Sequence, residues 1–137
     1  VAQFVEKPPV TLARLMIVFI WIWHGLIPKL IFHHIDEQTM VAQAGVPVYF
    51  LPWIGAFEII LGLITLVTWN RRSVLLLNIL LMLIATLEVA IHSPAYLTAA
   101  FNPITLNLAV IALSAIGWVA GGLLPSARRC LRKPSKG

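Results

Sequence analysis

The chain has 137 residues, of which 60% are hydrophobic and 11% charged, and its mean hydropathy is +0.93. A soluble globular domain carries about 25% charged residues, so this composition leaves too little polar surface for a particle in water. The net charge is +5, but half of the basic residues lie in the last ten positions without interleaved aromatic residues, which argues against a surface for nucleic acid. The composition therefore indicates one integral membrane domain.

A membrane-spanning helix needs about 20 mostly apolar residues. Four stretches qualify, at about residues 10–32, 49–69, 73–91 and 103–124. Pro52 falls in the first turn of the second span, and Asn102 with Pro103 begins the fourth, where these residue types are favoured. We expect an all-α fold: a transmembrane four-helix bundle in a single domain, residues 1–125, followed by a basic cytoplasmic tail, residues 126–137.

The first connection, residues 33–48, is predicted to contain a short helix. Ile35 and Asp36, followed by Gly45 and Pro47, have the pattern of a cap, a short helix and a stop. Because the apolar positions of this segment fall on one side, we expect the helix to lie on the outer membrane surface as a lid.

The positive charges predict the orientation. Arg71 and Arg72 follow the second span and the basic tail follows the fourth, whereas the other two connections hold no Lys or Arg. By the positive-inside rule, both termini are cytoplasmic (N-in/C-in). The side chains expected to contact lipid headgroups are Arg14, Arg71, Arg72, Arg128 and Arg129.

Each span carries one stripe of polar or small residues at helical spacing. The stripes comprise His24, Gly25, Pro28 and Lys29; Gly55, Glu58, Gly62 and Thr65; Asn78, Ala85, Glu88 and His92; and Asn107, Ser114, Gly117 and Gly121. Lipid cannot hydrogen-bond to these groups, so we expect the stripes to face one another inside the bundle.

The depth of each ionisable residue suggests how the groups pair. His24 and Glu58 lie ~12 Å below the outer end of their spans, and Lys29 and Glu88 lie ~5–6 Å below it. A single charge at mid-bilayer costs about 2.5–3.5 kcal/mol, so we expect His24 to pair with Glu58 and Lys29 with Glu88. A protonated Glu58 is the alternative, and a carboxyl beside a histidine also suits proton exchange. A purely structural contact between helices stays open for the acids and for His24.

Other chemistries find little support in the sequence. His33, His34, Asp36 and Glu37 crowd the first connection, but their spacing matches no metal-ligand pattern, so we expect no metal. The single Cys130 can form no internal disulfide. No phosphate-binding glycine loop, nucleophile elbow or His-Glu-x-x-His pattern occurs. We therefore assign no catalytic residue and expect a protein that is not an enzyme on its own.

With these motifs, the chain resembles the DoxX-like family of small four-span bacterial membrane proteins over roughly residues 14–117. The motifs are Arg14, His24-Gly25-x-x-Pro28-Lys29, Gly55-x-x-Glu58-x-x-x-Gly62 and Asn102-Pro103. The resemblance implies a bundle in the bacterial cytoplasmic (inner) membrane with a link to redox chemistry, since relatives include a subunit of a thiosulfate:quinone oxidoreductase. Redox-associated relatives carry cysteine pairs, which this chain lacks, so thiol chemistry is not carried over.

These observations lead to the hypothesis of a redox-associated membrane subunit. It would contact a quinone in the outer half of the bundle, bind no cofactor covalently, and work with a partner oxidoreductase or larger membrane complex. The expected ligand-binding residues are Trp21, His24, Lys29, Trp53, Glu58, Glu88 and His92. Two alternatives stay open: a non-catalytic accessory or anchor subunit, and a binder of a lipid-like small molecule.

Overall fold

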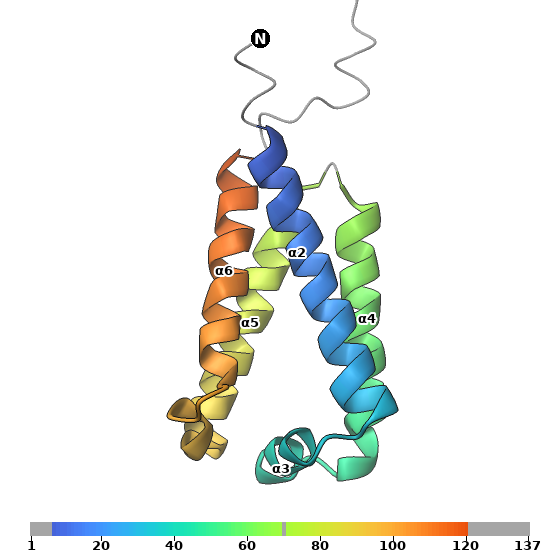
Figure 1. Ribbon diagram of the computed structural model, residues 1–137, viewed down its shortest axis with the longest axis vertical. Coiled ribbons are helices and arrows are strands. Elements are labelled where there is room, and N and C mark those ends of the chain that lie inside the picture. The colour runs from blue at the N-terminus through green and yellow to red at the C-terminus, as the bar shows by residue number, and fades with distance from the viewer. Residues whose placement is uncertain (1–6, 70, 121–137) are drawn as a thin grey trace, which may run out of the picture.

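The computed structural model describes residues 7–69 and 71–120, and within them every regular element is a helix. Four long helices run along the molecule (Figure 1): α2 (Lys7–Gly25), α4 (Leu51–Val67), α5 (Ser73–His92) and α6 (Pro103–Ala120). Four short elements complete them: the π-helical turn η1 (Leu26–Ile31), α3 (Ile35–Gln43), and the 3-10 turns η2 (Val48–Phe50) and η3 (Pro94–Leu97).

Four segments are long and apolar enough to cross a membrane: Pro9–Ile31, Val48–Val67, Ser73–His92 and Pro103–Ala120. The sequence therefore predicted the number and position of the spans correctly. The expected end of the fourth span and the basic tail lie outside the described residues. Many large apolar side chains, such as Phe19, Ile60 and Leu83, are exposed on the outside of the helices, where a bilayer would cover them.

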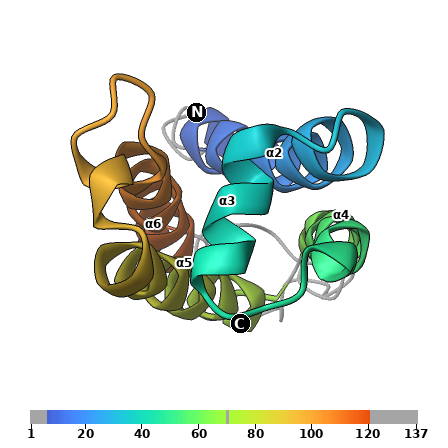
Figure 2. The same cartoon turned by 90° about the horizontal axis from the view of Figure 1, so that it is seen from below.

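The bundle consists of two helix pairs. α2 packs along α4, and α5 packs along α6; α2 also contacts α6, whereas α4 and α5 barely touch although a short turn joins them. The pairs meet at one end of the molecule and separate toward the other (Figure 1). We call these the Arg14 end and the α3 end, because α3 lies across the second one (Figure 2).

A buried core and a polar network join the pairs toward the Arg14 end. Ile17, Leu61, Leu75 and Val110 are among the buried apolar residues that pack together there. The fully buried Asn78 links three helices: its amide nitrogen donates to Thr65 Oγ1 (3.3 Å) and its oxygen accepts from the Trp21 indole. Because every polar partner in this network is another buried side chain or carbonyl, the network fixes how the helices pack.

Arg14 takes a different place from the one expected at the lipid headgroups. Its side chain is buried, with 3% of the residue exposed. Its guanidinium donates to the carbonyls of Thr65 (2.9 Å), Thr68 (3.2 Å) and Arg71 (3.2 Å). The last carbonyls of a helix lack partners within the helix and carry partial negative charge. Arg14 therefore binds the end of α4.

Two glycines bring the first pair into close contact. A Cβ added at Gly55 would lie 2.5 Å from the carbonyl oxygen of Gly25 and 2.9 Å from Lys29 Cβ. Only the absence of a side chain lets the two backbones approach this closely. The same approach brings the next helical turns together, including Lys29 of η1 and Glu58 of α4.

The contact predicts a specific glycine requirement. Gly55→Ala should lower the free energy of unfolding by about 1–3 kcal/mol, because the methyl group meets backbone that cannot move aside. Gly117→Ala is the matched control: its Cβ would meet only the flexible end of Leu75 (2.8 Å). Its gain of ~1 kcal/mol in helix propensity should offset that crowding. Thermal unfolding in detergent, followed by circular dichroism, measures both; equal losses would contradict the prediction.

Candidate functional site

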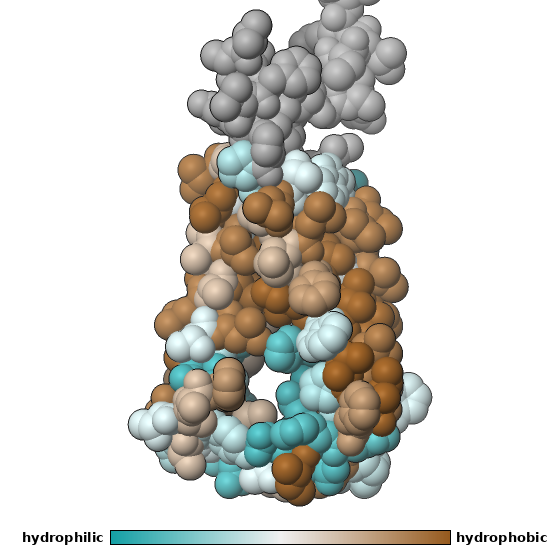
Figure 3. All heavy atoms as spheres, viewed as in Figure 1, coloured by the Kyte–Doolittle hydropathy of each residue, from teal (hydrophilic) through white to brown (hydrophobic). Residues whose placement is uncertain are grey.

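A cavity of about 840 Å³ lies between the two helix pairs, toward the α3 end. Residues of α2, η1, α3, α4, α5 and α6 line it. In Figure 3 an opening passes through the molecule at this level, and hydrophilic residues gather around it. Volumes of about 300–1,000 Å³ are typical of pockets that hold small molecules. The splayed end of the bundle is therefore a candidate binding site.

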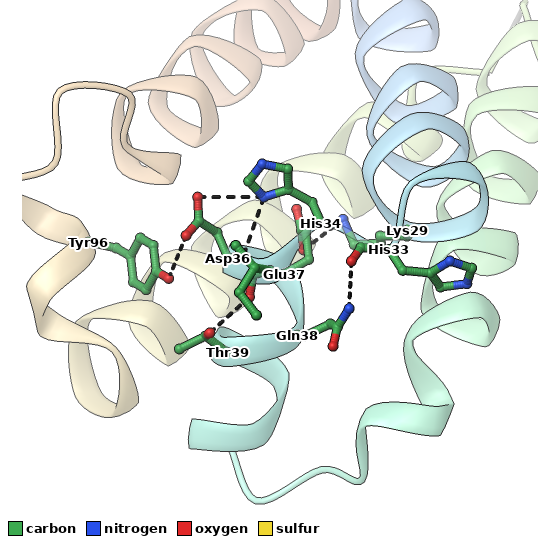
Figure 4. Close-up of polar contacts among 9 residues, drawn as sticks. Lys29, His33, His34, Asp36, Glu37, Gln38, Thr39 and Tyr96 are labelled. Carbon is green, nitrogen blue, oxygen red and sulfur yellow. Dashed lines mark hydrogen bonds and ion pairs between the residues drawn. The ribbon is translucent and has the colours of Figure 1, made fainter.

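α3 covers the cavity at the end of the bundle. The carboxylate of Asp36 accepts a hydrogen bond from Tyr96 of η3 (3.1 Å), and Gln43 accepts one from Ser93 at the end of α5 (2.6 Å). On its other side, Glu37 contacts Lys29 (Figure 4). Burial and the contact with Asp36 raise the pKa of the Tyr96 phenol, so it stays a donor at neutral pH. α3 therefore bridges both helix pairs.

The sequence predicted this short helix, but not its cap. His34 begins it: the Nδ1 atom of its ring accepts from the backbone of Asp36 (3.3 Å). Past its end, Gly45 takes a positive φ of 76°, which favours glycine. No residue of α3 is buried, so polar contacts at its ends hold it in place.

The central group of the site is the ammonium of Lys29. Pro28 has no N–H, so the carbonyl of His24, four residues earlier, lacks its usual helical partner. The chain forms a π-helical turn there, and Lys29 Nζ donates to the carbonyl of His24 (3.2 Å). This accounts for the spacing in the His24-Gly25-x-x-Pro28-Lys29 motif. Pro28 leaves the carbonyl of His24 without a backbone donor, and the ammonium of Lys29 donates to it instead.

Two carboxylates share the same ammonium. Lys29 Nζ lies 3.0 Å from Glu58 Oε2 and 3.2 Å from Glu37 Oε2. The side chains of Lys29 and Glu58 are 7% and 16% exposed, so this ion pair is largely removed from solvent. Counting the carbonyl of His24, the ammonium has three close acceptors for its three donors.

The expected pairings were wrong. Glu58 pairs with Lys29, not with His24, and Glu88 pairs with His92 (3.2 Å), not with Lys29. The expectation compared the heights of backbone positions. Helical side chains lean toward the N-terminus of their helix. Because α2 and α4 are antiparallel, Lys29 and Glu58 lean toward each other and close the difference in height.

The cavity gathers most of the expected ligand-binding residues. Those that line it are Trp21, His24, Lys29, Glu58 and Glu88. The other two lie apart from it: Trp53 is 72% exposed on the outside of α4, and His92 contacts Glu88 from the exposed end of α5. Trp53 lies five residues before Glu58, about 1.4 helical turns, which turns it to the outer side of the helix.

Some lining residues were not assigned to the site from the sequence. Glu37 and Asn107 contribute to the cavity wall. Asn107 belonged to the polar stripe of the fourth span, which was the available signal. Glu37 was considered only as a metal ligand, and nothing in the sequence indicated that α3 would fold back onto Lys29. Among the described residues, no group of three His, Cys, Asp or Glu could hold a metal ion.

The sequence model of the DoxX-like family matches residues 18–115, which is most of the chain and includes the second and third spans entirely and most of the first and fourth. The chain belongs to the DoxX-like family. Together with the four apolar helices, this makes the protein a multi-pass membrane protein. Neither the curated proteins nor the solved structures contain a match to this DoxX-like chain.

The ion pairs around Lys29 predict a large effect of its removal. Lys29→Met should lower the free energy of unfolding by about 3–5 kcal/mol, because it leaves Glu58 buried without a counter-charge. Adding Glu58→Gln to this variant should restore part of the loss. The control is Arg71→Met, an exposed side chain whose loss should cost less than about 0.5 kcal/mol. A double variant no more stable than Lys29→Met alone would contradict this account.

Proposed function

We propose that this protein is a redox-associated membrane subunit that binds a quinone in the cavity at the α3 end. The observation that carries the proposal is the chemistry of the cavity wall. Its deeper part is apolar and aromatic, with Trp21, Trp23 and Met82, and its α3 end holds Lys29 and Glu58. A quinone combines the same two kinds of surface, since it has an apolar ring with polar oxygens at its edge. A few polar groups in the cavity are enough to orient such a molecule.

Access to the cavity supports a ligand that is dissolved in the membrane. α2 and α4 are packed closely at Gly25 and Gly55, and α5 packs along α6, so neither pair leaves a passage. α3 covers the end of the bundle. The remaining openings lie between the pairs, at the level of the apolar spans (Figure 3). A ligand arriving through them would come from the bilayer, which is where long-tailed quinones reside.

A partner completes the proposal. With one cysteine, the chain has no internal dithiol to accept or supply two electrons. Electrons to or from a bound quinone would therefore pass through another protein, for which an oxidoreductase or a larger membrane complex is the natural candidate. In this arrangement the chain holds and orients the quinone beside its partner.

Filling the cavity tests the binding function. Ala85 lines the cavity, whereas Ala90, on the same helix, is exposed and does not. Ala85→Phe should abolish the quinone that co-purifies with the protein, measured by solvent extraction and chromatography, and Ala90→Phe should retain it. Titration of tryptophan fluorescence with added quinone gives a second measurement, since Trp21 and Trp23 line the cavity.

Three results of this experiment would count against a quinone. Phospholipid in place of quinone in the extract, removed by Ala85→Phe, would favour a binder of lipid-like molecules. Equal quinone in both variants would place it outside the cavity. Binding of neither molecule, with co-purification of a large assembly, would favour an accessory or anchor subunit.

We further propose that both termini are cytoplasmic and that the α3 end faces the outside of a bacterial inner membrane. The arginines of the turn between α4 and α5 support this orientation. In intact cells, an impermeant maleimide should label Thr98→Cys, made in a Cys130→Ser background, and should spare native Cys130. Both positions should react after permeabilisation, which serves as the control; labelling of Cys130 alone in intact cells would reverse the topology.

A further inference from the structure

The hydrogen-bonding groups of the cavity are unevenly used. Several of its donors are occupied: Lys29 donates to the carbonyl of His24 and lies within ion-pair distance of Glu37 and Glu58, Tyr96 donates to Asp36, and Asn107 donates to Thr86 Oγ1 (3.2 Å). The amide nitrogen of Asn102 also donates, to the carbonyl of Ala99 (3.2 Å). Among the described residues of the wall, these donors already have acceptors, and the rings of His24 and Trp23 remain as further donors.

Two acceptors, in contrast, are buried without a hydrogen bond. Glu58 Oε2 and Glu88 Oε1 are shielded from solvent and accept no hydrogen bond within the described part of the chain. Each lies within ion-pair distance of a basic side chain, Lys29 and His92 respectively, but without hydrogen-bond alignment. A buried acceptor that is left unmatched costs free energy, so both favour a ligand that donates.

The two acceptors lie on different sides of the cavity. Glu58 belongs to α4, in one helix pair, and Glu88 belongs to α5, in the other. These helices barely touch, and the cavity separates them. A ligand that satisfies both therefore needs two hydrogen-bond donors at opposite edges of a flat, largely apolar body that fits beside Trp21.

We propose that the cavity selects the reduced form of the quinone, a quinol, whose two hydroxyl groups donate to Glu58 and Glu88. This rests on the proposed function and adds which redox form is bound. A quinol donates through both hydroxyls, whereas a quinone can only accept, and hydrogen bonds to an ionised acceptor are the stronger kind.

The charge of the wall leads to the same conclusion. Four carboxylates line the cavity, those of Asp36, Glu37, Glu58 and Glu88, against the one ammonium of Lys29. This excess of negative charge opposes anionic ligands such as fatty acids or phosphate esters. Among neutral molecules, it favours one that presents hydroxyl hydrogens to the carboxylates.

The test compares the two redox forms of one quinone, bound anaerobically to the detergent-purified protein. The quinol should bind at least about tenfold more tightly than the quinone, the equivalent of ~1.4 kcal/mol. Glu58→Gln and Glu88→Gln should each reduce this ratio, because an amide can donate to a quinone carbonyl. Arg71→Gln is the control and should preserve the ratio, since Arg71 is exposed and lies outside the cavity.

Each other outcome has a defined meaning. Equal affinity for the two forms, or a ratio that neither Gln variant changes, overturns the inference and leaves quinone binding intact. Tighter binding of a lipophilic ammonium probe than of the quinol also overturns it, because the acids would then serve a cation. Binding of neither form removes the proposed function itself. If Glu58→Gln does not fold, Glu88→Gln carries the same comparison, since its carboxylate is more exposed and pairs only with His92.

Discussion

The ammonium of Lys29 is the interaction on which the α3 end of this molecule depends. It joins the carbonyl of His24, the carboxylate of Glu58 on α4 and the carboxylate of Glu37 on α3. Without it, two acids would face the same cavity with no counter-charge, and α3 would lose its ion pair with the first helix pair. The proline one residue before Lys29 makes the arrangement possible, because it removes the hydrogen bond that would otherwise satisfy His24. Pro28 thus has two effects. It leaves the carbonyl of His24 free to accept from Lys29, and it produces the π-helical turn that directs the Lys29 side chain toward that carbonyl.

The contacts that hold the helices together and the candidate binding cavity lie toward opposite ends of the bundle. Toward the Arg14 end, buried apolar side chains, the network around Asn78 and the guanidinium of Arg14 join all the helices. That end can hold the fold together while the α3 end stays open, with contacts that are few, polar and at the ends of α3. Regions of low local stability are where lids and binding loops are usually found. The separation of the helix pairs is therefore a consequence of where the apolar and polar contacts are placed along the helices.

The sequence was sufficient for the spans and for the inner faces of the helices. Hydropathy defines the spans because a helix must cross the whole apolar layer. The stripes located the cavity wall because polar groups cannot face lipid: His24, Lys29, Glu58 and Glu88 all line one space, although they come from three helices. The contact between Gly25 and Gly55 follows from the same stripes, since small residues mark close approach. The helical spacing of polar and small residues therefore predicts which side of a helix each side chain lies on.

The partners of those side chains needed information that periodicity does not contain. The packing of the helices decides whether Lys29 can reach Glu58 or Glu88. Because α2 packs on α4, Lys29 reaches Glu58, and the cavity separates Lys29 from Glu88. The contacts of Arg14 could not be predicted from the sequence either. Its acceptors are backbone carbonyls, and every residue of any sequence has one. The mistaken pairing also changes the chemistry of the site. Had Lys29 paired with Glu88, its charge would lie between the two helix pairs and could meet a ligand directly. Lys29 is instead held among acceptors on the side of the first pair, so Glu88 on the second pair stays free for the quinol that we propose.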